Sequence, residues 1–176
     1  PAFFRPGRYE YEITADLRKL CSDLDSECIV NIGLGTSPEF PPKLMVPMQG
    51  RRVQEGDNLF CLVEVSGPGG YYCEISRVWS LGQPSEAMLK ASAAAVGAAA
   101  EVEKWLKPGS TGAQLLKANN DYLTARGYFP EGRLFGHGQG YDMVERPAFV
   151  NAETMPLAEN MFVTAHPGAS DGKALG

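Results

Sequence analysis

The sequence predicts a mixed α/β fold of the α+β type, with outer helices and antiparallel strands arranged in two similar halves. Two observations favour this fold. Helix-like and strand-like segments alternate along a chain of 176 residues, of which 44% are apolar. A short pattern of residues also recurs in the second half of the chain. Because this length suits one domain with a sizeable core, we expect residues 1–176 to form a single domain.

The first half contains one helix-like segment and three strand-like segments. Tyr9, Ile13, Leu17, Leu20 and Leu24 are spaced as on the apolar face of a helix. Proline and glycine punctuate the segments that follow, and a Gly-Pro-Gly-Gly turn separates the last two. These patterns predict a helix over 9–24, a strand over 29–34, a loop over 36–48 and a hairpin with strands over 59–65 and 71–80.

The second half begins with an Ala-rich helix. Ser85 precedes this segment and Glu86 lies in its first turn, which is typical of a helix N-terminus. Pro108-Gly109 ends the helix, and Gly127 ends the next one. The sequence therefore predicts helices over 85–106 and 112–126, followed from Leu134 onward by short strands that glycine and proline interrupt.

An internal repeat supports the division into two halves. Three matches share an offset of 102 residues: Arg5-Pro6-Gly7 with Lys107-Pro108-Gly109, Asn58 with Asn160, and Phe60 with Phe162. The repeat predicts two α/β halves that face each other across a pseudo-two-fold axis, with a site between them. It also predicts that the second half lacks the return strand of its hairpin, because the counterpart of Glu74 would be residue 176, where the sequence stops.

The composition argues against several classes of partner. The net charge of -5 disfavours nucleic acid, which requires a clustered positive field. No apolar run reaches the roughly 20 residues needed to span a bilayer, and no basic leader precedes an apolar segment at the N-terminus. Cys21, Cys28, Cys61 and Cys73 contain no CxxC pair, so we expect buried, reduced thiols. We therefore predict a cytoplasmic protein that binds a small-molecule substrate, with no nucleic acid and no membrane among its partners.

The two histidines of the chain occupy unusual positions. His137 lies between glycines that permit close approach of the backbone to a ligand, and His166 follows a predicted strand directly. The repeat aligns His166 with Glu64, and Glu74 lies across the first hairpin. Two imidazoles and two carboxylates suit one zinc, iron or manganese ion, so we predict these four residues as metal ligands. The alternative is that both histidines only satisfy local hydrogen bonds.

A second cluster of reactive groups follows His137. A carboxylate beside an imidazole can act as a general base, and an arginine can bind a substrate carboxylate through two parallel hydrogen bonds. We therefore predict His137, Asp142 and Tyr141 as catalytic residues and Arg146 as a substrate-binding residue. The alternative is that Glu145 and Arg146 form a solvated pair at a strand edge.

Four segments together resemble the pita-bread family, which includes creatinase, aminopeptidase P and methionine aminopeptidase. They occur in the family's order over nearly the whole chain: Val53 to Asn58, Tyr72 to Arg77, Gly136 to Pro147, and Phe162 to Gly168. The resemblance implies a pita-bread fold with a curved antiparallel sheet, whose C-terminal strand is missing from this sequence. Because a missing strand would leave an open sheet edge, we expect association as a homodimer or with the missing C-terminal segment.

The expected ligand positions depart from the family's peptidases, which hold two ions with two aspartates, one histidine and two glutamates. Glu64 and Glu74 stand at the aspartate positions, each longer by one methylene, and His166 stands at the first glutamate. The second glutamate would lie beyond Gly176, and Val144 replaces a substrate-facing histidine. Because a two-metal site needs ions about 3.5–4 Å apart, the resemblance implies one divalent ion or none.

Three functional hypotheses remain open. The first is an enzyme of this family, designated M24, that acts on a small polar substrate by metal-assisted or acid/base hydrolysis or by lyase chemistry. The stretch from His137 to Pro147 also resembles the branch with the dimethylsulfoniopropionate lyases, in which Asp142 or Tyr141 would take a proton beside a carboxylate. The second is a pseudoenzyme or binding module, and the third is an Xaa-Pro-type metallopeptidase. An enzyme is favoured because retaining buried polar groups together is costly without a function.

Overall fold

The structure is a computed structural model that describes residues 3–37, 50–172 and 176, with only the backbone for residues 30–37. The chain divides into two compact units, Pro1–Glu86 and Ala87–Gly176. Both units combine helices with antiparallel strands, as predicted. The single domain expected for 1–176 stays a prediction.

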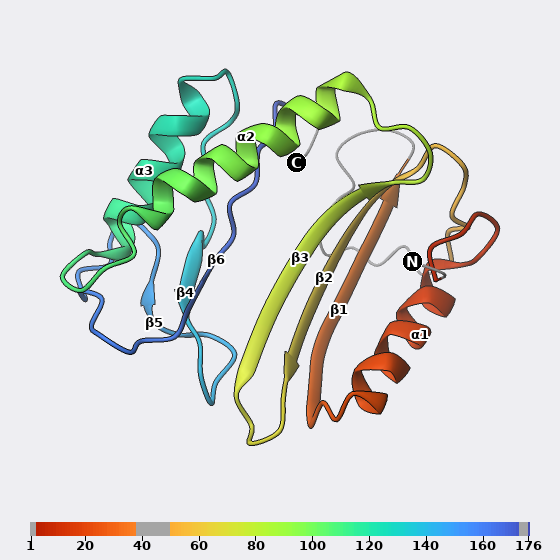
Figure 1. The fold of residues 1–176 in the computed structure, drawn as a ribbon, viewed down its shortest axis with the longest axis horizontal. Coiled ribbons are helices and arrows are strands. Elements are labelled where there is room, and N and C mark those ends of the chain that lie inside the picture. Colours follow the sequence, from red (N-terminus) through yellow and green to blue (C-terminus); the bar gives the residue numbers. More distant parts are fainter. Residues whose placement is uncertain (1–2, 38–49, 173–175) are drawn as a thin grey trace. The chain divides into compact units, whose positions relative to one another are not determined.

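The first unit consists of one helix and a three-stranded antiparallel sheet (Figure 1). Helix α1 spans Glu10–Asp23, and the strands are β1 (Cys28–Ser37), β2 (Asn58–Ser66) and β3 (Tyr72–Ser80), in the order β1-β2-β3. The predicted helix and hairpin are thus confirmed. Ile13 of α1 packs with Leu59 and Cys61 of β2 in one apolar cluster, so α1 covers one face of this sheet.

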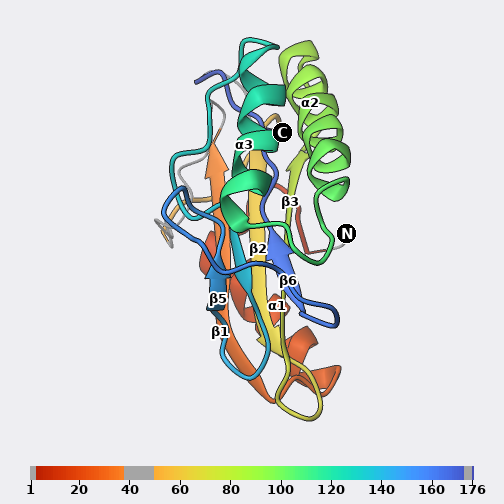
Figure 2. The same cartoon turned by 90° about the vertical axis from the view of Figure 1, so that its left-hand side faces the viewer.

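The second unit contains helices α2 (Glu86–Glu103) and α3 (Gly112–Thr124) and the strands β4 (Gly136–Gly138), β5 (Glu145–Ala148) and β6 (Val163–Ala165). The strand order is β5-β4-β6, and both pairs are antiparallel. Figures 1 and 2 both show α2 and α3 side by side. A side chain at Gly97 of α2 would overlap the Tyr122 ring of α3, so glycine permits this close approach. The core gathers Leu115, Phe135 and Phe149, none of which is exposed to solvent.

Two element bounds differ from the predictions. Strand β1 continues past the glycines expected to end it, because its pairing with β2 runs on to Ser37 opposite Asn58. Residues 36 and 37 of the predicted loop therefore belong to a strand, and residues 38–48 of that loop lie outside the described residues. Helix α2 ends at Glu103 rather than at 106, because the N–H groups of residues 105 and 106 donate to carbonyls three residues earlier, in tighter turns that replace the α-helical pattern.

The repeated sequence pattern corresponds to a repeated local structure in the two units. Gly7 and Gly109, which are 102 residues apart, both have a φ of 89°. Each lies two residues before the N-cap of a helix, and each donates its N–H to a later backbone carbonyl. The glutamate or glutamine at the third helical position then accepts the N-cap N–H, at 2.8 Å in α1 and 2.9 Å in α3. Helices α1 and α3 therefore begin with the same helix entry.

The four cysteines form no disulfide, but they are not all buried. Cys61 is buried within the core cluster, whereas Cys28 and Cys73 are exposed and Cys21 is half-buried. The expectation of four buried thiols is wrong for Cys28 and Cys73. Cys28 is the first residue of the edge strand β1, and Cys73 belongs to the alternate residues of β3 that face solvent. Within the described ranges, every helix falls short of the length and apolarity that a bilayer crossing requires.

Candidate active site

Two glutamates face each other across the hairpin of the first unit. Glu64 of β2 and Glu74 of β3 are direct cross-strand partners. Directly opposite side chains lie on the same face of a sheet, with Cβ atoms about 4.5–5.5 Å apart. Like charges in such a pair repel each other, and a cation or a shared proton relieves the repulsion. The predicted position of Glu74 across the hairpin from Glu64 is confirmed, and this carboxylate pair suits a cation chemically.

Two imidazoles lie together in the second unit. His137 of β4 pairs with Thr164 of β6, and His166 follows two residues later, so the side chains of His137 and His166 share a face of the sheet. Their ring centroids are 5.4 Å apart and the planes meet at 66°. The backbone N–H of His166 donates to the carbonyl of Phe135 at 2.8 Å, which continues the β4–β6 ladder by one pair. The structure thus brings together the two histidines that the sequence singled out.

The tautomer of His137 follows from a single hydrogen bond. Its Nδ1 lies 2.8 Å from the carbonyl oxygen of Gly138. A carbonyl oxygen can only accept, so Nδ1 carries the proton and Nε2 keeps its lone pair in the neutral ring. Histidines that bind metals commonly donate their other ring N–H to a backbone carbonyl in this way. The donor set of the second unit therefore fits a divalent metal, with Nε2 of His137 as one ligand atom.

Glycines on the opposite face of β4 set the position of His137. A Cβ added at Gly138 would lie 2.5 Å from the carbonyl oxygen of Arg146, and one added at Gly136 would overlap the Phe149 ring. Strand β4 is therefore pressed directly against β5 and the apolar core. Only glycine permits this close approach, and the approach determines where the backbone of His137 lies relative to β5.

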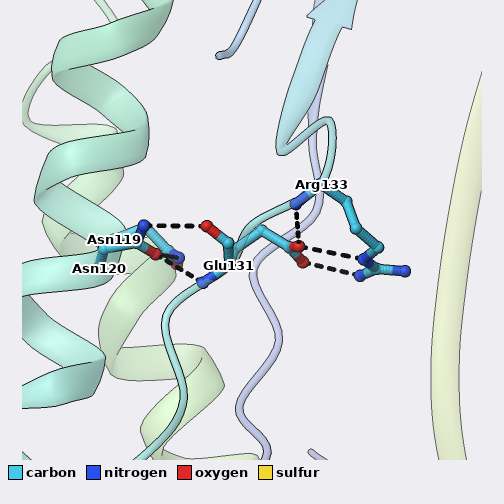
Figure 3. Close-up of polar contacts among 4 residues, drawn as sticks. All are labelled: Asn119, Asn120, Glu131 and Arg133. Atoms are coloured by element: carbon cyan, nitrogen blue, oxygen red, sulfur yellow. Dashed lines mark hydrogen bonds and ion pairs between the residues drawn. The ribbon is translucent and has the colours of Figure 1, made fainter. Parts of the chain in front are cut away.

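The segment between α3 and β4 is held by side-chain hydrogen bonds (Figure 3). Asn120 donates to the Glu131 carbonyl at 3.0 Å and accepts the Glu131 N–H at 2.8 Å. The Glu131 carboxylate accepts three hydrogen bonds from Arg133, from its backbone N–H, Nε and Nη2. Burial alone would raise the pKa of Glu131. The hydrogen bonds and the charge of Arg133 together lower it by more than burial raises it, so the pKa lies below its usual range. The chain thus enters β4 from a fixed position.

Arg146 is bound by a carboxylate of its own unit. Its Nε and Nη2 donate to Glu153 at 3.1 and 2.6 Å. Glu153 is buried and also accepts the backbone N–H groups of Ala148, Thr154 and Met155. The side-chain hydrogen bond from Arg146, followed by those backbone bonds, holds the pKa of Glu153 well below its usual range. A substrate carboxylate would therefore meet a guanidinium that is already oriented, and the substrate-binding role of Arg146 stays a prediction.

Glu153 had no signal in the sequence. It lies in a polar loop without a motif, and only the fold places it beside Arg146 and the N–H of Ala148, which is the β5 partner of His137. The alternative of a solvated pair between Glu145 and Arg146 is wrong, because Glu145 accepts the Asp142 N–H at 2.9 Å while Arg146 binds Glu153.

Tyr141 and Asp142 lie in the turn that follows β4. The Gly140 N–H donates to the Asp142 carbonyl at 3.1 Å, and both Tyr141 and Asp142 are exposed, Tyr141 to 69%. This turn is near His137 in sequence and belongs to the same unit. The catalytic roles of Tyr141 and Asp142 stay predictions.

Comparison with known proteins identifies the family. Residues 1–175 match the model of metallopeptidase family M24. The chain is 26% identical over 176 residues to the probable dipeptidase PepE of Mycobacterium tuberculosis, covering 96% of this chain and 45% of that protein. The crystal structure of dipeptidase PepE from Mycobacterium ulcerans matches with a TM-score of 0.85 and 28% identity over 99% of this chain and 47% of that one.

A second solved structure agrees with this assignment. The X-Pro aminopeptidase from Thermotoga maritima matches with a TM-score of 0.85 and 26% identity, over 98% of this chain and 49% of that one. The chain thus spans about half the length of the relatives it matches. These matches confirm the predicted pita-bread fold, and the chain belongs to metallopeptidase family M24.

Proposed function

We propose that this chain carries the active site of a metal-dependent hydrolase that acts on a small polar substrate such as a dipeptide. The imidazole pair is the observation that carries this proposal. His137 and His166 share one face, and with the proton on Nδ1 of His137 its Nε2 would be the ligand atom. The family assignment and the relatives described as a dipeptidase and an X-Pro aminopeptidase support hydrolysis as the reaction.

The residues proposed to hold the metal are His137, His166, Glu64 and Glu74. Imidazole nitrogen and carboxylate oxygen together suit zinc, iron or manganese. When bound, such an ion polarises a substrate carbonyl and lowers the pKa of a water molecule. The change from aspartate to glutamate at positions 64 and 74, and from glutamate to histidine at position 166, favours one ion over two. A divalent ion would also offset the repulsion between the opposed carboxylates of Glu64 and Glu74.

The chain's own side chains supply the remaining roles in this proposal. Asp142, which lies in the turn after β4, would accept a proton from the substrate or deliver one to it. Arg146, whose guanidinium is oriented by Glu153, would bind a substrate carboxylate through the donors that Glu153 leaves. Dipeptides carry a free carboxylate, which gives this arginine a ligand.

Elemental analysis of the whole protein tests the proposal. The purified protein should contain one equivalent of zinc, iron or manganese, and His137→Ala and Glu74→Gln should each lose it. Asp23→Asn is a matched control, since Asp23 is an exposed carboxylate that pairs with Lys19 on α1. Retention of a full equivalent of metal in His137→Ala would contradict the ligand assignment.

Hydrolysis of dipeptides with and without proline at the second position tests the substrate class. We expect the wild type and Asp23→Asn to hydrolyse dipeptides, and His137→Ala to hydrolyse none. A wild-type protein that holds no metal and hydrolyses none of the dipeptides would instead favour a binding module. Exclusive hydrolysis of Xaa-Pro dipeptides would favour the Xaa-Pro metallopeptidase hypothesis.

A further inference from the structure

We propose that Gln139 accepts a hydrogen bond from an N–H group of the substrate, and that it selects substrates that carry such a donor close to the bond that is broken. The inference rests on the proposed hydrolase function and adds a substrate-positioning residue to it.

The position of Gln139 follows from the β4–β6 ladder. Its backbone N–H donates to the carbonyl of Phe162 at 3.0 Å, which extends the ladder one pair beyond β4. Side chains two residues apart on a strand point to the same face. Gln139 therefore lies on the face that carries His137 and His166, opposite the face that packs on the core.

Gln139 is buried although its side chain is polar. Only 3% of the residue is exposed to solvent. Its Nε2 donates to the Met143 carbonyl at 3.5 Å. This long contact favours the orientation with Nε2 toward Met143, because the reverse orientation would set two oxygens against each other.

The amide oxygen of Gln139 is the atom that implies a ligand. Among the described residues, none offers a hydrogen-bond donor to Oε1. Buried acceptors in folded proteins nearly always have a donor, because an unmade hydrogen bond is costly in a low-dielectric environment. An oxygen of this kind can only accept, so the group that completes it must carry an N–H or O–H.

A dipeptide offers two such donors. One is the α-ammonium group, and the other is the N–H of the amide bond that is hydrolysed. An Xaa-Pro substrate carries only the first, because the proline nitrogen has no hydrogen. A site that hydrogen-bonds a substrate N–H discriminates against an analogue that lacks it, since the buried acceptor is then left unpaired.

The test compares three probes on the whole protein: alanyl-alanine, its analogue without the α-amino group, and its analogue with a methylated amide nitrogen. Hydrolysis and calorimetric binding are measured for the wild type and for Gln139→Met, which preserves side-chain length and removes the acceptor. We expect Gln139→Met to bind and hydrolyse alanyl-alanine roughly tenfold less well. We also expect Gln139→Met to lose the wild-type preference for alanyl-alanine over one of the two analogues. The N–H group that this analogue lacks is then the donor to Gln139.

Control measurements separate this inference from the proposed function. Gln139→Met should keep its metal content and melting temperature. If the wild type hydrolyses none of the probes, the proposed function fails. If it hydrolyses them and Gln139→Met keeps the same preference, or a bound water alone completes Oε1 in the substrate complex, only the role of Gln139 is refuted.

Discussion

Replacement of Gly138 by alanine tests how tightly the fold sets His137. The added Cβ would lie 2.5 Å from the carbonyl oxygen of Arg146 and 2.9 Å from its carbonyl carbon. Both atoms belong to the backbone of β5, so neither can rotate away. Ordinary contact begins at 3.4 Å, and β4 and β5 must therefore separate by 0.9 Å, the difference between 3.4 and 2.5 Å.

This separation sets the expected magnitude. Overpacking of a well-packed site costs typically about 1–3 kcal/mol, and a clash with backbone belongs near the upper end. For a chain of this size each kcal/mol lowers the melting temperature by about 2–4 °C, so we expect Gly138→Ala to lower it by roughly 6–12 °C. The same shift moves the Gly138 carbonyl that accepts the hydrogen bond from Nδ1 of His137, so metal content should fall as well.

Thermal unfolding by circular dichroism and elemental analysis measure the two effects. Gly132→Ala is the matched control, because a Cβ at Gly132 has nothing within 4 Å and its φ is not positive. We expect the control to keep the wild-type melting temperature and metal content. If Gly138→Ala matches Gly132→Ala in both measurements, the close approach of β4 to β5 does not position His137.

Three further predictions concern charge, thiol reactivity and helix capping. Glu153→Gln should be less stable than the wild type at neutral pH, and the difference should shrink as the pH falls below about 4.5. The lowered pKa of Glu153 contributes stability only while the carboxyl group is ionised, and urea unfolding from pH 7 to pH 3 measures the effect. Burial raises the pKa of the Cys61 thiol to about 11, so at pH 8 a thiol reagent should modify the exposed Cys28 and Cys73 first, as peptide mapping would show. Thr111→Ala should cost about 0.5–1 kcal/mol in the same urea assay, because Thr111 caps α3 through a long hydrogen bond of 3.4 Å.

Much of the fold could be predicted from local sequence, because helix entries and hairpin turns depend on a few residue types. The positive φ of Gly7 and Gly109 explains why the same dipeptide begins a helix twice. The end of β1 could not be predicted in this way. Strand pairing with β2 continues through glycines, and that pairing involves residues far apart in sequence.

The candidate site could be predicted in part for the same physical reason. His137 and Glu74 stand out because glycines or a hairpin fix their surroundings locally. Glu153 and Gln139 gave no such signal, since their importance arises from contacts across β4, β5 and β6. Arg146 illustrates the difference: its chemistry suggested a substrate ligand, while the fold supplies a buried carboxylate that binds it first.

The 102-residue repeat keeps the backbone features of the helix entries but not the side chain at the proposed metal-ligand position. At an offset of 102 residues, Gly7 and Gly109 keep the same φ, and the helix entries keep the same hydrogen bond to the N-cap. At the same offset Glu64 becomes His166, so a carboxylate is replaced by an imidazole where the backbone needs neither. Both side chains are common metal ligands, so this difference is compatible with the metal proposed for this chain. The metal proposed for this chain is therefore best tested at positions 64 and 166, where the two units differ in ligand chemistry.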